Sequence, residues 1–351
     1  MKDLKESVES IISENYRKTT HGLSLCIYKD GKQIYRNSMG KIESLSFQYT
    51  DNTIYDIASL TKPVITTTIT GKLIERGKIS LEDNLGSLGF IAKNNLSNIT
   101  IRSLLSHSTG LIWHYPLYEQ GRDRESYIST IKLLGEQSKI YTREEYSDLN
   151  FILLGFLLEY IYGKSLDEIA EMEIIRPLGL KNTGFNLNRD SSIIAPTENT
   201  EDRGLLWGKV HDENSYYLGG VAGHAGLFSN IDDLSIFMKS LLDGKLLNNK
   251  TLELFTSSQN RYLGGTYGLG WMVKTEKAEK SSPSYGLSMF MGDYAPLGTF
   301  GHTGFTGTSI IANKEMNLFS ILLTNRVYPT RENINILRFR RLLNNAIFLN
   351  I

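Results

Sequence analysis

The sequence predicts an α+β fold in which an antiparallel sheet is built from both ends of the chain and a mainly helical region is inserted between them. Alternating apolar residues, which are typical of strands, gather near the start of the chain and again after residue 299. Apolar residues at helical spacing fill much of residues 60–180 instead. The sheet region is predicted to comprise residues 1–58 and 206–351, and the helical region residues 59–205, within one folded unit.

The chain is predicted to begin with an amphipathic helix that is followed by a β-hairpin. Apolar residues of the first twenty positions recur every three or four residues, and they are Leu4, Val8, Ile11, Ile12 and Tyr16. In residues 23–36 the side chains of Leu23, Leu25 and Ile27 share one face of a strand, and Asp30-Gly31 supplies a tight turn.

Helical spacing continues in the middle of the chain, and strand patterns return near its end. The predicted helices are residues 63–75, 99–106, 149–162, 165–174 and, as the last element, 331–348. The predicted strands are residues 299–311 and 318–324, on either side of a polar turn at 313–317. The polar, aperiodic segments 186–204 and 275–286 are predicted to be surface loops.

The composition excludes several classes of protein. The 351 residues include 38 Lys plus Arg and 38 Asp plus Glu, so a strongly basic nucleic-acid-binding protein is not expected. The single cysteine, Cys26, excludes an intrachain disulfide and a cysteine-based metal site. The chain has neither a stretch of ~18 apolar residues nor the apolar core of a secretory signal. We therefore expect a cytoplasmic protein without membrane or nucleic-acid partners.

The segment Ser59-Leu60-Thr61-Lys62 places a hydroxyl and an amine three residues apart at the start of a predicted helix. Residues at this spacing share a helix face. A serine hydroxyl becomes a good nucleophile when a base takes its proton, and a lysine can act as that base when its pKa is lowered. Pro63 fits the first turn of such a helix. The spacing alone is also that of an ordinary solvated helix start.

Two further motifs strengthen the functional interpretation. They are Tyr146-Ser147-Asp148, directly before an apolar helix, and Gly301-His302-Thr303-Gly304 in a glycine-rich strand. Together with the Ser-x-x-Lys motif and in this order, they resemble the serine β-lactamase and penicillin-binding protein superfamily. The Tyr-x-Asn type of middle motif is most similar to its class C-like branch, which includes esterases and D-amino-acid peptidases. The resemblance covers about residues 20–345, with supporting blocks ITIRSLLSHSTGL, RPLGLKNTGF, HDENSYYLGGVAGHAGLFSNIDDL and YGLGW.

The resemblance implies a β-lactamase/transpeptidase-like fold and a role for each motif residue. Ser59 is expected to be the acylated nucleophile, Lys62 its proton acceptor or electrostatic partner, and Tyr146 a proton relay. Which of Lys62 and Tyr146 holds the proton stays open. The backbone N–H groups of Ser59 and Phe305 are expected to form an oxyanion hole, and Gly304 to leave room for substrate. The resemblance calls for neither a cofactor nor a metal ion.

Two residues depart from the pattern of the superfamily. His302 stands where lysine is usual, so we expect a weaker and pH-sensitive anchor for a substrate carboxylate. Asp148 replaces asparagine, and it either adds negative charge near the substrate or pairs with Lys62 and keeps it charged. Both changes favour a neutral ester or amide over a penicillin. We expect a serine hydrolase that forms an acyl-enzyme on an ester, amide or D-amino-acid peptide bond. The alternatives are a β-lactamase or D-Ala-D-Ala carboxypeptidase, and a noncatalytic protein that binds or senses such ligands.

The remaining polar clusters have structural and functional interpretations. For His107, His114 and the His211-Asp212-Glu213 cluster, a metal site is the less favoured interpretation. His107 is expected to close a helix end. The cluster at 211–213 is expected to order a loop near the cleft, and His224 to act similarly. The basic run Arg338, Arg340 and Arg341 is predicted to be a solvated helix face. The aromatic residues Trp113, Tyr115 and Tyr118 line a substrate pocket or pack in the core. The sequence leaves the oligomeric state open.

Overall fold

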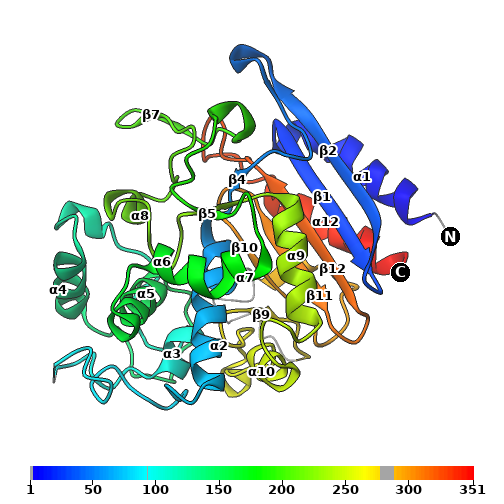
Figure 1. Ribbon diagram of the computed structural model, residues 1–351. Helices are drawn as coiled ribbons and strands as arrows, with labels where there is room; N and C mark the ends of the chain where they lie inside the picture. Colours follow the sequence, from blue (N-terminus) through cyan, green and yellow to red (C-terminus); the bar gives the residue numbers. More distant parts are fainter. Residues whose placement is uncertain (1–2, 93, 277–287) are drawn as a thin grey trace.

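A computed structural model describes residues 3–92, 94–276 and 288–351. Within these residues a seven-stranded antiparallel sheet has the order β3-β2-β1-β12-β11-β10-β9 (Figure 1). Its strands are β1 Gly22–Lys29, β2 Lys32–Ile42, β3 Phe47–Gln48, β9 Met272–Val273, β10 Phe300–Thr303, β11 Ser309–Asn313 and β12 Leu318–Thr324. Because β1 pairs with β12, the two ends of the chain meet in the middle of the sheet, which confirms the predicted fold class.

Different parts of the chain cover the two faces of the sheet. Helices α1 (Leu4–Thr19) and α12 (Ile336–Leu349) lie together on one face (Figure 1). Leu23, Leu25 and Ile27 of β1 pack on these helices, whereas Cys26 belongs to the core on the opposite face. The alternation follows from the two-residue period of a strand, and it confirms the predicted shared face.

The predicted hairpin between β1 and β2 is also confirmed. Lys29 pairs with Lys32, and Asp30 and Gly31 both have positive φ angles, 51° and 73°. This is the conformation that a two-residue hairpin turn of right-handed twist requires, and a glycine adopts it readily.

The opposite face of the sheet carries the predicted helical region. Its helices are α2 Thr68–Glu75, α3 Ile101–Leu105, α4 Arg124–Leu134, α5 Asp148–Tyr162, α6 Leu166–Ala170 and α7 Arg176–Leu178, and α8 Glu213–Tyr217, α9 Ile231–Leu242 and α10 Asn249–Phe255 follow. Short 3-10 or π turns are η1 Glu43–Leu45, η2 Ala58–Leu60, η3 Lys62–Thr67, η4 Leu117–Glu119, η5 Glu171–Ile175, η6 Ser191–Ile193, η7 Arg261–Leu263 and η8 Met289–Met291. Residues 149–158 of α5 are all buried, which explains their nearly continuous apolar sequence.

A small sheet positions the segment that leads to Ser59. Its strands are β4 Tyr55–Asp56, β8 Leu227–Ser229 and β5 Gly184–Phe185, in the order β4-β8-β5. Directly after β4, the Ile57 N–H donates to the Leu227 carbonyl at 3.0 Å. The chain is thus fixed by backbone hydrogen bonds two residues before the serine. A separate ribbon of β6 (Asn199–Thr200) and β7 (Gly204–Leu205) lies in the predicted loop 186–204.

Three sequence predictions about elements need correction. Residues 299–311 are not one strand, because the chain turns at 304–308 between β10 and β11, where the Gly304 N–H donates to the Thr308 carbonyl at 2.7 Å. The last helix begins at Ile336 and not at 331. Its basic run is not uniformly solvated, since Arg338 is exposed but Arg340 is only 4% exposed. Most of the predicted loop 275–286 lies outside the described residues.

Among the described residues, no single helix is long and apolar enough to cross a membrane. Helix α5 and residues 166–178 pass the same test of length and composition only as a pair, which is bent by 76°.

Candidate active site

Ser59 lies at a strained turn between the small sheet and the helical region. It is half-buried in η2, and the residue before it, Ala58, has a φ angle of 47°. A positive φ is unfavourable for alanine, so the surrounding structure must hold it in place. The buried carboxylate of Asp56 does so by accepting a hydrogen bond from the Ala58 N–H at 2.8 Å. Strain of this kind is frequent where a reactive side chain is presented.

Lys62 is buried one helical turn after Ser59 and contacts three acceptors. Its Nζ lies 2.9 Å from Ser59 Oγ, 2.7 Å from Asp148 Oδ1 and 3.0 Å from the carbonyl oxygen of His224. Three acceptors match the three N–H groups of an ammonium. Burial lowers the pKa of Lys62, while the charge of Asp148 acts in the opposite direction. Of the two expected roles of Asp148, negative charge near the substrate or pairing with Lys62, the structure shows the pairing.

Tyr146 contacts the same serine as Lys62. Its hydroxyl donates to Ser59 Oγ at 3.0 Å, and Lys62 Nζ lies 5.0 Å from the centre of its ring. The ring packs against His107 and Tyr267, with centroid distances of 4.8 and 6.2 Å. Burial, assisted by the charge of Asp148, raises the pKa of Tyr146 well above its usual value. At neutral pH the phenol therefore carries its proton.

Asp148 is the first residue of α5, where the helix dipole favours a carboxylate. Burial alone would raise its pKa, but Lys62 and His114 outweigh burial, and the pKa of Asp148 is lowered overall. His114 Nδ1 lies 3.7 Å from Asp148 Oδ2. Asp148 is thus an ionised group shared between an ammonium and an imidazole.

His302 is part of the site but does not carry the charge expected of it. The side chain is 1% exposed, its Nδ1 lies 2.8 Å from the Thr303 carbonyl, and its ring centre lies 6.2 Å from that of Tyr146. Burial and the nearby Lys62 lower the pKa of His302 to about 3. The prediction of an anchor that becomes charged near pH 6.5 is therefore corrected, because the imidazole stays neutral at that pH.

The turn after His302 packs against the segment that carries Ser59. Thr303 is half-buried and ends β10, and Gly304 follows it. A Cβ at Gly304 would lie 2.4 Å from the Ile57 carbonyl and 2.2 Å from Thr308 Oγ1. The glycine therefore allows two segments of the protein to approach each other closely, and this replaces the expectation that it makes room for substrate.

Two threonine hydroxyls fasten this turn to the serine segment. Thr306 Oγ1 donates to the Asp56 carbonyl at 2.7 Å, and Thr308 Oγ1 donates to the Ile57 carbonyl at 3.0 Å. The side chain of Phe305, between them, is 51% exposed. Within the part of the chain that the structure describes, the Phe305 N–H has no acceptor.

The N–H of Ser59 is the second donor that the sequence places here. The first hydrogen bond within η2 is donated by Leu60 to the Ile57 carbonyl at 3.1 Å. The N–H of Ser59 precedes that bond, and early N–H groups of a helical turn lack acceptors within it. The structure thus brings the Ser59 segment and the Phe305 turn together, and both carry N–H groups suited to an anion.

Sequence reasoning underestimated a supporting layer around Lys62. The carbonyl of His224 accepts from Lys62, and the ring of His224 lies 2.8 Å from Asp212 Oδ1. His107 accepts from the Ser147 N–H at 3.1 Å, which fixes the residue between Tyr146 and Asp148. The blocks GGVAGHAG and HDENSYY were the signals for the first contact, but their spacing in sequence does not show that they meet.

The structure also defines the surroundings of His211 and of the aromatic loop around Trp113. His211 Nε2 lies 2.9 Å from Glu198 Oε2, and both side chains are buried. The described residues contain no group of three or more His, Cys, Asp or Glu side chains arranged to hold a metal ion. The Trp113 carbonyl accepts from the Asp148 N–H at 2.9 Å, and the Trp113 side chain is 62% exposed. The aromatic loop therefore borders the site.

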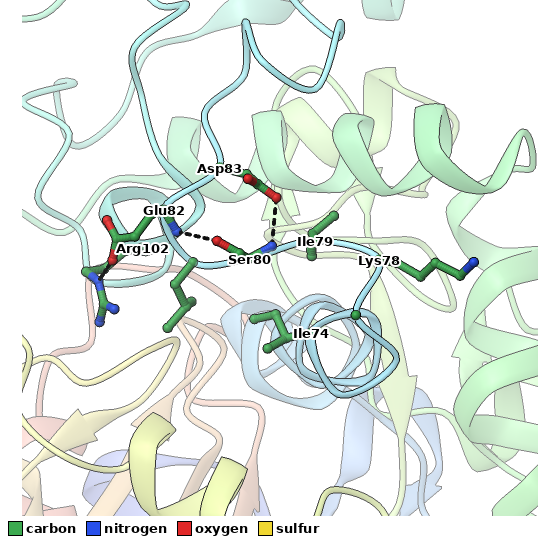
Figure 2. Close-up of a pocket in the computed structure, with 9 residues that line it drawn as sticks. Ile74, Lys78, Ile79, Ser80, Glu82, Asp83 and Arg102 are labelled. Atoms are coloured by element: carbon green, nitrogen blue, oxygen red, sulfur yellow. Dashed lines mark hydrogen bonds and ion pairs between the residues drawn. The ribbon is translucent and has the colours of Figure 1, made fainter.

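A surface hollow of about 570 Å³ lies elsewhere, after the end of α2 (Figure 2). It is lined by Ile74, Gly77, Lys78, Ile79, Ser80, Leu81, Glu82, Asp83 and Arg102. Its polar groups bind one another, as when the Ser80 N–H donates to Asp83 Oδ2 at 2.7 Å. None of the motif residues lines this hollow.

Comparison with known proteins agrees with the fold and the motifs. Residues 8–345 match the model of the Beta-lactamase family. An Escherichia coli (strain K12) protein named for D-alanyl-D-alanine carboxypeptidase activity is 33% identical, over 87% of this chain and 78% of its own length.

Solved structures share the same fold at low sequence identity. EstCE1, described as a hydrolase with promiscuous acyltransferase activity, has a TM-score of 0.75 at 21% identity, covering 98% of each chain. D-amino acid amidase from Ochrobactrum anthropi SV3 has a TM-score of 0.72 at 18% identity, covering 99% of this chain and 100% of its own.

The mixed helix and antiparallel sheet scaffold and the family match together define the class of the protein, a serine hydrolase of the β-lactamase/transpeptidase fold. The chain belongs to the Beta-lactamase family, whose members are serine hydrolases.

Proposed function

We propose that Ser59 is the nucleophile of this hydrolase and that Lys62 and Tyr146 together act as its base. The observation that supports this assignment is the convergence on Ser59 Oγ of Lys62 Nζ at 2.9 Å and the Tyr146 hydroxyl at 3.0 Å. Both distances lie within the reach needed for proton transfer. A nucleophile in contact with its base is the arrangement that covalent catalysis requires.

The proposed cycle has two steps that share these groups. Ser59 Oγ attacks the substrate carbonyl, and its proton passes to the Lys62 and Tyr146 pair. The N–H groups of Ser59 and Phe305 bind the oxygen that becomes negative. The pair then protonates the departing alcohol or amine, which leaves the acyl group on Ser59. A water molecule then attacks the acyl carbonyl and gives its proton to the same pair. The bond between the acyl carbon and Ser59 Oγ breaks, the pair returns the proton to Oγ, and the acid is released.

Lys62 and Tyr146 exchange a proton as one coupled pair in this scheme. Asp148 stabilises the ammonium form of Lys62. The phenol of Tyr146 is protonated in the resting protein because its pKa is raised. The pair becomes a base once it loses one of these protons. Two groups in such close contact titrate together, so the active form belongs to the pair and not to either residue.

For substrate, we propose an ester or amide that has no carboxylate, including the amide of a D-amino acid. His302 offers no positive charge to a substrate carboxylate, because its pKa is lowered to about 3. A carboxylate-ended substrate would lose a charged hydrogen bond, which is worth ~1.5–3 kcal/mol. The D-amino acid amidase among the structural neighbours supports this class. D-Ala-D-Ala carboxypeptidase activity is the second candidate, because the E. coli relative is named for it.

A panel of substrates distinguishes the two candidates. We expect p-nitrophenyl acetate and D-alanine amide to be hydrolysed continuously, with kcat/KM at least about tenfold above that for an N-acylated D-alanyl-D-alanine and above that for nitrocefin. The variant Ser59→Ala is the control and should lose turnover of every substrate. Preference for the D-alanyl-D-alanine peptide would favour the carboxypeptidase. A single stoichiometric burst without turnover would favour a noncatalytic binding protein.

A further inference from the structure

Arg340 connects the last helix to the turn that carries Phe305. Its guanidinium Nη2 donates to the Gly304 carbonyl at 2.8 Å and to the Thr308 carbonyl at 2.6 Å. The side chain is only 4% exposed, whereas Arg338 on the same helix is solvent-exposed. A cation thus lies directly against both ends of the turn between β10 and β11.

Among the residues that the structure describes, this buried cation has no counter-ion. In the described ranges, no carboxylate pairs with Arg340, and its Nε–H has no acceptor. Burial, with repulsion from Arg326, lowers the pKa of Arg340 to about 9. Burying an unpaired charge costs several kcal/mol. The two carbonyls that it contacts have other donors, since the Gly304 carbonyl accepts from Gly307 and the Thr308 carbonyl from Gly304. Arg340 is therefore not needed to satisfy them.

The contact with Gly304 acts on the group that faces the substrate carbonyl in the proposed function. The Gly304 carbonyl and the Phe305 N–H belong to one peptide group, whose electrons are delocalised. A cation bound to the oxygen draws electron density from the nitrogen and makes the N–H a stronger donor, since hydrogen bonds in a chain polarise one another. Its charge also favours a negative charge that develops nearby in a buried site.

A second arginine, Arg326, contacts the next peptide group, but unlike Arg340 it has an acidic neighbour. Arg326 Nε donates to the Phe305 carbonyl at 2.8 Å. Burial lowers the pKa of Arg326 to about 10, and the charge of Glu198 opposes that effect. Arg340 has no such acidic neighbour among the described residues. Its charge is therefore the less compensated of the two.

We propose that Arg340 is a positioning residue of the oxyanion hole, which polarises the Gly304–Phe305 peptide group and so strengthens the binding of the oxyanion by the Phe305 N–H. The inference rests on the proposed function of Ser59 and Phe305. In this proposal, the negative charge of the tetrahedral intermediate serves as the counter-ion of Arg340, and that charge exists only during the reaction. Catalysis gains from such an interaction because it is stronger in the transition state than in the ground state.

The test compares neutral and charged replacements of Arg340. In Arg340→Met and Arg340→Gln we expect kcat for p-nitrophenyl acetate to fall on the order of tenfold to a hundredfold with KM nearly unchanged. The Ki of phenylboronic acid, which forms a tetrahedral adduct with a serine, should rise by a similar factor. Arg340→Lys keeps the charge and should recover part of both losses. Arg338→Met removes an exposed arginine of the same helix and should change neither.

Thermal unfolding of each variant separates an effect on the site from an effect on the fold. If Arg340→Met does not fold, Arg340→Gln decides the matter, because it keeps an uncharged N–H donor on a shorter polar side chain. Wild-type kcat and wild-type Ki of phenylboronic acid in a folded neutral variant would overturn the inference. The variant Ser59→Ala distinguishes a failure of the proposed function from a failure of the inference about Arg340. If that variant still turns over the ester, the proposed function itself fails, and if only the Arg340 variants behave as wild type, this inference alone fails.

Discussion

Asp148 influences the protonation of Lys62 and Tyr146, the pair proposed as the base. Its negative charge stabilises the Lys62 ammonium at 2.7 Å and disfavours a phenolate at Tyr146. Both effects keep protons on the pair. An asparagine here, as is usual in the superfamily, would exert neither effect, so the change alters the pH at which the pair becomes a base.

The variant Asp148→Asn tests this reasoning through the pH dependence of kcat/KM. Removing the carboxylate lowers the pKa of Lys62 and the pKa of Tyr146, so the rise of kcat/KM with pH should move to lower pH. Asp167→Asn, an exposed carboxylate of α6, serves as the control and should leave the profile in place. A profile that stays in place in Asp148→Asn, or moves to higher pH, would contradict the assigned role.

His302 shows why a residue type alone is a weak guide to charge. Its reference pKa predicts a titration near neutral pH, but that value assumes contact with water. The folded chain buries the ring beside Lys62 and leaves the imidazole neutral. Sequence reasoning identified the position, whereas its electrostatic state depends on neighbours that are distant in sequence.

The turn between β10 and β11 is the element that joins the two halves of the site. It is fastened by Thr306 and Thr308 to the backbone before Ser59, and Gly304 lets the segments approach. The predicted single strand over 299–311 missed this turn, because its glycines, which recur every third residue, also fit a strand that another backbone approaches closely. The distance between Ser59 and Phe305 depends on this packing.

Gly304→Ala tests the importance of that approach. The new Cβ would collide with the Ile57 carbonyl, a backbone atom that cannot rotate away. A displacement of about 1 Å at a reacting group can cost ~10²-fold in rate, so we expect kcat/KM to fall by about that factor. Gly179→Ala, at a positive φ but with open space around it, should lose ~1 kcal/mol of stability and keep its activity. Unchanged kcat/KM in Gly304→Ala would mean that the turn tolerates displacement.

Helix α9 shows a pattern that sequence analysis passed over. Asn230 caps it by accepting from the Asp233 N–H at 3.0 Å, and its buried residues include Leu234, Phe237 and Leu241. Cap and spacing are both visible in the sequence. The sequence therefore contains enough local signal to predict this helix.

For the molecule as a whole, the sequence predicts architecture better than it predicts electrostatics. The strands at both chain ends, the hairpin at Asp30-Gly31 and the buried α5 follow from local periodicity and turn chemistry, and each is present. The burial of Arg340 depends on α12 packing across the sheet onto a turn from another element. No local pattern contains that information, because a basic run in a helix is usually solvated.

We propose that the folded chain activates one particular hydroxyl, that of Ser59. Labelling of the whole protein with a fluorophosphonate, followed by mass spectrometry of the intact chain and of its peptides, tests this directly. We expect one adduct per chain, located on Ser59, and none in Ser59→Ala. Equal labelling of Ser59→Ala, or an adduct on another residue in the wild-type protein, would contradict it.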